Sequence, residues 1–326
     1  MARVLYTRFK RMKMLGSGGC ADAYLAGDRV TGRPVTLKCL KKGNEKEMNK
    51  AAESLKNEAQ ILSKLKHPGI PRIADCGEDY IATEYVPGRS LYQILGESGK
   101  MKEKEAAQIG AELVSILEYL HSLPEPVIYR DLKPSNIIVR PSGKITLIDY
   151  GAARIYREGE TTDTTYLGTC GFAAPEQYGN LGQTDPQTDI YCFGMTLLQM
   201  ISGIDLKDDQ AVERAKAAGV KGVSPEFMAV IDKCIKPDRE DRFKNCSEIR
   251  NALKKYPVKV KTRKAMLFIK VGLASACLSG VISAGATYYE PVSAYIREDA
   301  DKRIPAVKER LGIARARIEE YREELK

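Results

Sequence analysis

The stretch from 127 to 151, VIYRDLKPSNIIVRPSGKITLIDYG, decides the fold of this chain. It contains two short apolar runs, at 137–139 and 145–148. The five residues between these runs, Arg-Pro-Ser-Gly-Lys, have the composition of a tight turn. Two apolar runs joined by such a turn predict a β-hairpin.

Four polar side chains flank the predicted hairpin. Asp131, Lys133 and Asn136 precede it, and Asp149 follows it directly. Hard cations such as Mg²⁺ prefer oxygen ligands, and phosphoryl oxygens prefer positive charge. The cluster therefore suits a site that holds a metal ion and a phosphate, although aspartate and asparagine also occur in loops as simple turn formers.

The same stretch resembles the catalytic core of eukaryotic-type serine/threonine protein kinases. YRDLKPSN at 129–136 is similar to the catalytic-loop pattern H-R-D-L-x-x-x-N, and Asp-Tyr-Gly follows where D-F-G is usual. The resemblance implies an α+β, bilobal kinase fold with a small β-rich N-lobe and a larger α-helical C-lobe. It also implies that Asp131 and Lys133 are catalytic and that Asn136 and Asp149 bind the metal ion.

A glycine-rich stretch near the N-terminus, LGSGGCADAY at 15–24, is similar to the nucleotide-binding loop of these kinases. Gly16 and Gly18 would let the backbone approach phosphates closely, because no Cβ intervenes. Ala23 stands where the family has a valine. Downstream, Val-Thr-Leu-Lys ends at Lys38, the position of the lysine that grips the α- and β-phosphates. Gly-Ser-Gly-Gly alone is also common in flexible turns.

Two segments have the periodicity of amphipathic helices. Apolar residues recur at helical spacing in 45–66 and again in 106–120. The first segment resembles the helix of the kinase N-lobe, and this resemblance makes Glu58 the ion partner of Lys38. Pro68 is expected to end that helix, because the residue before a proline avoids the helical conformation.

A strand is predicted at 80–88, where Tyr-Ile-Ala-Thr-Glu-Tyr-Val leads into Pro-Gly. By resemblance, the backbone from Glu84 to Val86 hydrogen-bonds the adenine ring. Without a nucleotide, the same residues would be an edge strand that ends at Pro-Gly. The resemblance implies ATP and Mg²⁺ as cofactors, with Mn²⁺ as an alternative ion.

Residues 152–173, closed by Ala-Pro-Glu, resemble a kinase activation segment. Threonines cluster in it, and Thr162, Thr164 and Thr165 are the predicted phosphosites. Arg130 precedes the catalytic aspartate, and in the family such an arginine helps to receive a phosphate on this segment. The alternative is a polar, solvated loop.

Three further positions match the family and are expected to be structural. Thr169 looks like the threonine that contacts the catalytic aspartate and lysine. Asp189 would brace the catalytic loop, and Arg242 would pair with Glu176. With these motifs, the resemblance extends over about residues 10–256.

The composition excludes several classes of protein. With 29% charged and 43% hydrophobic residues, the 326-residue chain is globular rather than disordered. Its eight cysteines lack CxxC spacing and the chain has only two histidines, so a zinc site is not expected and the cysteines are predicted to be reduced. The net charge of +9 raises the question of nucleic acid, but much of the excess positive charge lies in one linker.

That linker begins where the composition changes, at Lys254. Residues 258–264 are basic, and an uncharged run of 19 residues, 271–289, follows Lys270. At about 1.5 Å per residue such a run just spans the hydrocarbon core of a bilayer. We therefore predict a transmembrane helix at 265–289, with a soluble helix rich in Ala, Ser and Gly as the alternative. The basic flank favours a cytoplasmic kinase domain and an anionic membrane surface, not nucleic acid, as partner.

Two features of the C-terminal region favour a homodimer. Small residues recur at every fourth position from Gly272 to Ala284, which would let two helices approach closely in lipid. From Ile304 to Leu325, apolar residues alternate by three and four, as in a short coiled coil. A monomeric amphipathic helix is the alternative for the tail.

The sequence thus predicts a single-pass cell-membrane serine/threonine kinase of the bacterial kind with a C-terminal transmembrane helix, acting on protein substrates and activated by autophosphorylation of the activation segment. A pseudokinase scaffold and a small-molecule phosphotransferase of the same fold stay open as alternatives. The predicted domains are an N-lobe at 1–86, a C-lobe at 87–257, a basic juxtamembrane linker at 258–264, a transmembrane helix at 265–289 and an extracytoplasmic helical tail at 290–326.

Overall fold

The computed structural model describes residues 8–256 except 20, 42, 158–167 and 179–182. All of these residues belong to the first of two compact units, Met1–Val260. No helix within the described ranges is long and apolar enough to cross a membrane. The predicted linker, transmembrane helix and tail lie outside the described residues, and so do Thr162, Thr164 and Thr165.

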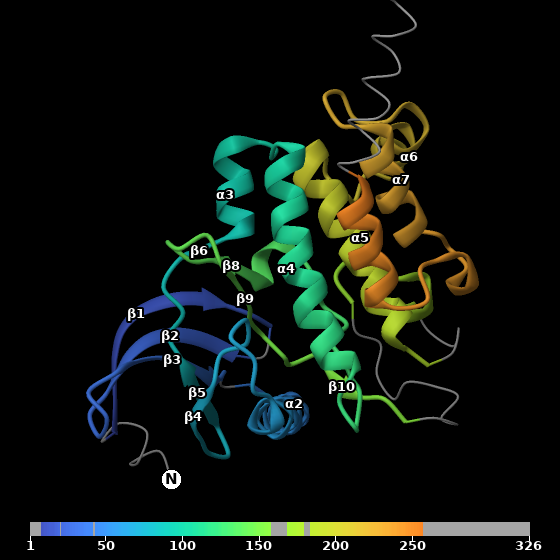
Figure 1. Ribbon diagram of the computed structural model, residues 1–326. Coiled ribbons are helices and arrows are strands. Elements are labelled where there is room, and N and C mark those ends of the chain that lie inside the picture. Colours follow the sequence, from blue (N-terminus) through green and yellow to red (C-terminus); the bar gives the residue numbers. More distant parts are fainter. Residues whose placement is uncertain (1–7, 20, 42, 158–167, 179–182, 257–326) are drawn as a thin grey trace, which may run out of the picture. The chain divides into compact units, whose positions relative to one another are not determined.

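The N-lobe is built on an antiparallel five-stranded sheet with the strand order β1-β2-β3-β5-β4 (Figure 1). Its strands are β1 (Phe9–Ser17), β2 (Ala21–Asp28), β3 (Pro34–Leu40), β4 (Ile73–Cys76) and β5 (Tyr80–Glu84). Val35, Leu37 and Cys39 alternate along β3 and are buried in a small core on one face of the sheet. Because side chains alternate between faces, Lys38 points to the opposite face.

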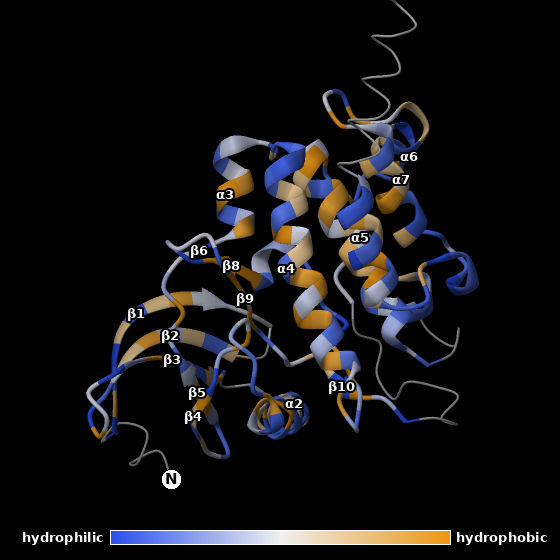
Figure 2. Cartoon of the chain, viewed as in Figure 1, coloured by the Kyte–Doolittle hydropathy of each residue, from blue (hydrophilic) through white to orange (hydrophobic). Residues whose placement is uncertain are grey.

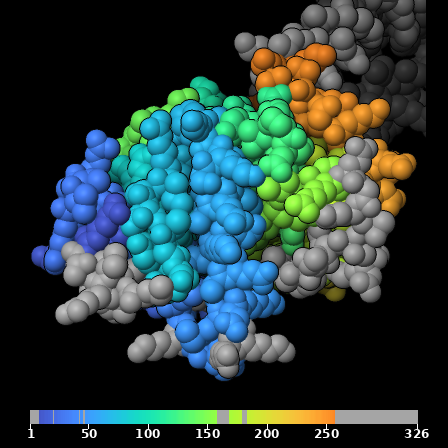
Figure 3. Space-filling model, turned by 90° about the horizontal axis from the view of Figure 1, so that it is seen from below, coloured from blue at the N-terminus to red at the C-terminus, as the bar shows by residue number. Residues whose placement is uncertain are grey.

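Helix α2 (Glu45–Lys64) packs beside this sheet, and it occupies the middle of the surface seen in Figure 3. The Asn44 side chain caps its N-terminus by accepting a hydrogen bond from the backbone N–H of Glu47. The helix ends two residues before the predicted boundary at 66. Leu65 is already extended there, although its N–H still bonds to the carbonyl of Leu62.

The C-lobe is mostly helical, and its principal helices α4 and α5 pack against one another with their apolar sides inward (Figure 2). Its helices are α3 (Leu91–Ser98), α4 (Glu103–His121), α5 (Pro186–Ser202), α6 (Asp209–Ala218) and α7 (Pro225–Cys234), followed by a helical run at 246–256. The predicted helix at 106–120 is confirmed as the greater part of α4. Leu113, Leu117 and Leu120 on its inner face are fully buried.

The predicted hairpin is confirmed. Strand β8 (Ile137–Val139) pairs antiparallel with β9 (Ile145–Leu147), and Gly143 in the turn has a φ of 79° that suits glycine. A third short strand, β6 (Arg89–Ser90), joins β8, and β7 (Val127–Ile128) pairs with β10 (Arg154–Ile155). The β7–β10 pair joins the residues just before the catalytic loop to the start of the activation segment.

Candidate active site

The loop that carries Asp131 is held in place by one buried carboxylate. Asp189, on α5, has no exposed surface and accepts hydrogen bonds from the backbone N–H groups of Tyr129 (2.8 Å) and Arg130 (2.7 Å). The same carboxylate lies 2.8 Å from Nε2 of His121, at the end of α4. The predicted bracing role of Asp189 is confirmed, and the histidine adds a third contact to it.

Asp131 is surrounded by three polar side chains. The Lys133 ammonium lies 3.0 Å from Oδ1 of Asp131, and the Thr169 hydroxyl donates to the same oxygen at 2.7 Å. The ammonium also donates to the Thr169 hydroxyl at 2.7 Å. Asn136 donates through Nδ2 to Oδ2 of Asp131 at 2.9 Å. The predicted contacts of Thr169 are confirmed, and together these bonds fix the plane of the carboxylate.

Lys38 and Glu58 form the predicted ion pair. Nζ of Lys38 lies 2.7 Å from Oε2 of Glu58 and 2.8 Å from Oδ1 of Asp149. The other oxygen of Glu58 accepts the backbone N–H of Tyr150 at 3.2 Å. The lysine on β3, the glutamate on α2 and the aspartate after β9 therefore meet at one point between sheet, helix and hairpin.

This charge cluster sets the ionisation of its members. Burial lowers the pKa of Lys38, but the two carboxylates outweigh burial and keep the pKa above its ordinary value. Burial raises the pKa of Glu58 in spite of the neighbouring ammonium. For Asp149, whose side chain is 46% exposed, partial desolvation is outweighed by the charge and hydrogen bond of Lys38, so its pKa is below the ordinary value. Asp149 is therefore ionised at neutral pH, as a metal ligand must be.

Two site residues have a backbone conformation that non-glycine residues rarely adopt. Arg130 has a φ of 70° and Asp149 a φ of 65°. Such a conformation is unfavourable and persists only where the surrounding structure imposes it. Contacts hold both residues in place, because the backbone N–H of Arg130 bonds to Asp189 and the Asp149 carboxylate bonds to Lys38.

The glycine-rich loop joins β1 to β2 at the edge of the same site. Gly16 lies opposite Ala23 in the strand register. A Cβ added at Gly16 would meet nothing within 4 Å, and one at Gly18 would make only ordinary contact. Neither glycine is required by the packing of the chain itself. Their use is explained by a ligand that needs close approach to the backbone, so the loop fits a nucleotide phosphate.

The predicted adenine-contacting residues lie where β5 leads into β6. Glu84 ends β5, and its backbone N–H donates to the carbonyl of Arg72 at 2.8 Å. Val86 is buried, whereas Gly88 has a φ of 148° and lies against the backbone of Val139. The segment is thus anchored at both ends, and its contact with adenine stays a prediction.

The donor set fits a metal ion bound mainly by phosphate. Nδ2 of Asn136 also donates to the backbone carbonyl of Asp131 at 2.9 Å. Its amide oxygen accepts a long bond of 3.4 Å from the Ser135 hydroxyl and has a second lone pair that can face a cation. Within the described residues, no group of three or more His, Cys, Asp or Glu could hold a metal ion alone. Asn136 and Asp149 together with phosphate oxygens and water are a ligand set typical of Mg²⁺.

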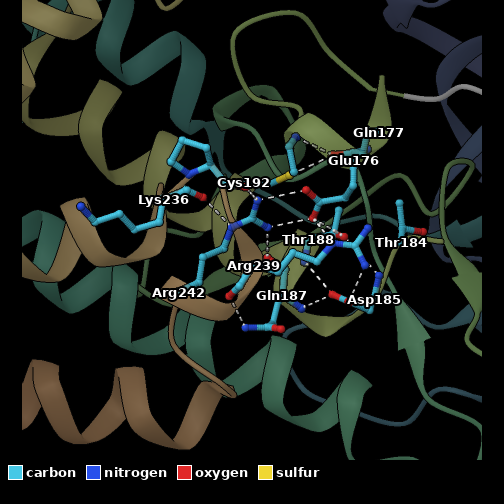
Figure 4. Close-up of polar contacts among 12 residues, drawn as sticks. Glu176, Gln177, Thr184, Asp185, Gln187, Thr188, Cys192, Lys236, Arg239 and Arg242 are labelled. Atoms are coloured by element: carbon cyan, nitrogen blue, oxygen red, sulfur yellow. Dashed lines mark hydrogen bonds and ion pairs between the residues drawn. The ribbon is translucent and has the colours of Figure 1, made fainter. Parts of the chain in front are cut away.

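A second buried ion pair joins the end of the activation segment to the C-lobe. Arg242 donates to both oxygens of Glu176, at 2.8 and 3.0 Å, and to backbone carbonyls on either side, as Figure 4 shows. Thr188 donates to the same glutamate at 2.8 Å. Burial would raise the pKa of Glu176, but Arg242 holds it below the ordinary value. The predicted pairing is confirmed as a structural contact.

Some residues of the site were not predicted from the sequence. His121 reaches Asp189 from another helix, and a lone histidine carries no local signal of such a contact. On α2, the Ser54 hydroxyl donates to the carbonyl of Gly151 at 3.2 Å and the Asn57 amide to that of Ala153 at 2.9 Å. Ser54, Asn57 and Glu58 have the i, i+3, i+4 spacing of one helix face. This spacing was the only signal in the sequence for the two contacts.

The comparisons with known proteins agree with this geometry. The family model for the protein kinase domain matches residues 9–255, and the chain belongs to this family. It is 33% identical over 219 residues to the probable serine/threonine-protein kinase PknB of Lactococcus lactis, covering 65% of this chain and 34% of that protein.

Two further relatives give the same result. Serine/threonine-protein kinase PrkC of Bacillus subtilis is 33% identical over 201 residues, covering 60% of this chain and 30% of that protein. Serine/threonine-protein kinase B of Synechocystis is 31% identical over 269 residues, covering 76% of this chain and 46% of that protein. The matched part thus spans about a third to a half of the length of these relatives.

Proposed function

We propose that this chain is an ATP-dependent protein kinase that phosphorylates serine and threonine hydroxyls of proteins. The observation that carries the proposal is the complete cluster of charged and polar side chains. Lys38 is bonded to Glu58 and Asp149 on one side, and Asp131 is bonded to Lys133 and Thr169 on the other. The serine/threonine kinases among its relatives support the choice of serine and threonine.

Each residue of the cluster has a defined task in this reaction. Bound ATP would supply the phosphoryl group, and Mg²⁺ would neutralise its charge. Asn136 and Asp149 would hold the ion, and Lys38, fixed by Glu58, would hold the phosphates. Asp131 would orient the acceptor hydroxyl and accept its proton, while the Lys133 ammonium beside it would stabilise the charge on the transferred group.

A substitution of the proton acceptor tests the proposal. Asp131→Asn should lower transfer of labelled phosphate from ATP to a protein substrate by about two or more orders of magnitude. Asp209→Asn, at the exposed start of α6, is the matched control and should retain the wild-type rate. Nucleotide binding without transfer by the wild type would indicate a pseudokinase. Transfer to small alcohols but to no protein would indicate the other enzyme class.

We also propose that residues 265–289 tether the kinase to the cell membrane with its catalytic domain in the cytoplasm. The support is the uncharged run at 271–289 behind the basic linker at 258–264. The full chain should then stay in the membrane fraction after alkaline washing, and protease added outside intact cells should remove only the tail. Release by alkali would contradict the tether.

We further propose that the kinase is activated by phosphorylation of Thr162, Thr164 or Thr165 by another copy of the same chain. The support is the position of these threonines between Asp149 and Thr169, and of the buried Arg130 beside the catalytic aspartate. Mass spectrometry after incubation with Mg-ATP should find phosphate on at least one of them. Full activity in a triple alanine variant would contradict this mode of activation.

A further inference from the structure

Lys41, the residue directly after β3, contacts the glycine-rich loop. Its ammonium donates to the backbone carbonyl of Gly18 at 2.5 Å and lies 3.5 Å from Oδ1 of Asp22. Asp22 stands opposite Ser17 in the register of β1 and β2, so it belongs to the base of the same loop. Lys41 belongs to none of the kinase motifs. One side chain thus joins the tip and the base of the loop to the neighbouring strand.

The face of the sheet on which Lys41 contacts Gly18 matters for nucleotide binding. Along β3, Lys38 and Leu40 face α2 and the main core, whereas Cys39 lies in the small core on the other face. Asp22 stands opposite Cys39 in the register of β2 and β3, so the Asp22 side chain and the Lys41 ammonium that contacts it lie on the face opposite Lys38. The carbonyl of Gly18 accepts a hydrogen bond from this ammonium, so it is directed to the same face, away from Lys38.

A planar trans peptide directs its carbonyl and the following N–H to opposite sides. With the Gly18 carbonyl held by Lys41, the N–H of Gly19 is directed to the side of Lys38, where the phosphates would lie. The turn is closed by a bond from the N–H of Gly18 to the carbonyl of Ala21, at 2.9 Å. The contact thus presents a backbone donor to the phosphate side of the loop.

The charges are suited to a persistent contact. A hydrogen bond from Ser17 and then the Lys41 ammonium lower the pKa of Asp22, so its carboxylate is ionised at neutral pH. The side chains of Lys41 and Asp22 are 34% and 24% exposed, so solvent screens part of their attraction. We therefore expect a moderate effect on binding and no collapse of the fold when either is replaced.

We propose that Lys41 and Asp22 are positioning residues for the nucleotide, which pre-order the glycine-rich loop so that its N–H groups face the phosphates. The proposal rests on the proposed kinase function for the identity of the ligand. Glycines lose more backbone freedom than other residues when they become ordered. A restraint that orders them before binding lowers the entropic cost of binding.

The test is nucleotide affinity of the full-length chain, measured by calorimetry with Mg-ADP and with a non-hydrolysable ATP analogue. Lys41→Met should weaken binding by about three- to tenfold, as expected for one charge-assisted contact. Lys41→Arg should stay within about twofold of the wild type because it keeps the charge and a donor. Lys10→Met, at an exposed position of β1, is the matched control and should bind like the wild type.

The Asp22→Asn variant separates this role from simple attraction between Lys41 and the phosphates. If Lys41 acted only by attracting phosphate, removing a nearby negative charge would tighten nucleotide binding. If Asp22 helps to hold the loop, the same change weakens binding, and adding it to Lys41→Met has little further effect. Tighter binding by Asp22→Asn would overturn the proposal, and so would wild-type affinity in Lys41→Met.

Activity provides a second, independent readout. In steady-state kinetics, Lys41→Met should raise the KM for ATP several-fold and leave kcat within about twofold, because the residue does not touch the reacting atoms. A wild type that binds nucleotide but transfers no phosphate would contradict the proposed kinase function, and the affinity measurements would still decide the role of Lys41. A wild type that binds no nucleotide would overturn both.

Discussion

At the scale of single residues, the Lys38 ammonium is what allows Glu58 to be buried as a charged group. Glu58 is almost inaccessible to solvent, and its other bond, from the backbone of Tyr150, is to a neutral donor. A buried carboxylate that loses its cationic partner takes up a proton. The lysine therefore has a structural role in addition to the phosphate contact that we propose.

Lys38→Met should abolish phosphoryl transfer and make stability depend on pH. Without the ammonium, burial raises the pKa of Glu58 further above the value in the unfolded chain, which is about 4.3. Between these two pKa values the folded state binds more protons than the unfolded state. Stability of the variant is then highest below the unfolded pKa and falls as the pH rises towards the folded pKa. Thermal unfolding between pH 5 and about pH 8 measures this. Lys38→Met combined with Glu58→Gln should remove the dependence.

The hydroxyl of Tyr150 is a second residue-scale feature. The side chain is fully buried, and its hydroxyl has no hydrogen-bond partner among the residues that the structure describes. The ring itself packs edge-to-face against Tyr129 at 5.1 Å. Tyr129 differs in that its hydroxyl donates to the carbonyl of Ile148. The two tyrosines therefore form a matched pair for measuring the cost of an unpartnered hydroxyl.

Tyr150→Phe should raise the unfolding temperature by about 2–4 °C, because it removes a buried polar group that makes no bond and leaves the ring in place. Tyr129→Phe should lower it, because the carbonyl of Ile148 would lose its donor. Differential scanning calorimetry of both variants checks the pair. A fall in the unfolding temperature of Tyr150→Phe would show that its hydroxyl is bonded in solution, for example to a buried water.

At the scale of elements, Arg242 joins the end of the activation segment to two parts of the C-lobe. It is fully buried and bonds Glu176 in the short helix η2 (Pro175–Gln177) as well as the backbone at Lys236 and Gln187 (Figure 4). Removing one partner of such a pair leaves the other charge buried and unpaired, which costs more than the pair itself contributes. The contact therefore fixes the segment through which Thr169 reaches Asp131.

Arg242→Met should destabilise the kinase domain by about 3–5 kcal/mol, and Arg242→Met combined with Glu176→Gln should recover part of this loss. Urea unfolding of both variants measures the difference. In the wild type, the pKa of Glu176 is lower in the folded state than the value of about 4.3 in the unfolded chain. Its contribution to folding stability is therefore present above about pH 4.3 and is lost as the pH falls through the folded pKa. Equal stability of the single and double variants would show that Glu176 is not the group left unpaired.

Elements with a long local pattern could be predicted from the sequence, and short ones could not. Helices α2 and α4 each have enough periodic residues to be recognised, and the motif order placed Lys38 and Glu58 together. The strands of the hairpin have only three residues each, but the turn composition between them made the hairpin recognisable. By contrast, β6, β7 and β10 have two residues each, and their pairing depends on distant strands. Contacts such as His121 with Asp189, or Lys41 with Gly18, join residues whose proximity only the folded chain creates.

At the scale of the whole molecule, the kinase domain is followed by about seventy residues that lie outside the described part of the chain. Their sequence predicts a tether and two candidate contacts between copies, the small-residue face at 272–284 and the apolar seam at 304–325. Holding two copies together raises the effective concentration of each for the other to roughly the millimolar range. A reaction between copies would then become independent of expression level.

Disrupting the small-residue face should lower phosphorylation of the activation segment without affecting the catalytic cluster. Gly272→Leu combined with Gly280→Leu would crowd that face and keep the run uncharged, so a membrane span would survive while close approach of two helices would not. Cross-linking in membranes and phosphate on 161–165 should fall together. Leu278→Ile in the same run is a control that should change neither.

A comparison of chain lengths completes this test. A chain ending at Tyr256 keeps the described kinase domain and lacks both candidate contacts. At low, matched concentration it should autophosphorylate more slowly than the full chain in membranes, and the difference should vanish when its concentration is raised towards the effective value. Equal rates of autophosphorylation at low concentration would mean that the tail does not bring two copies together. Its contribution would then be limited to the tether.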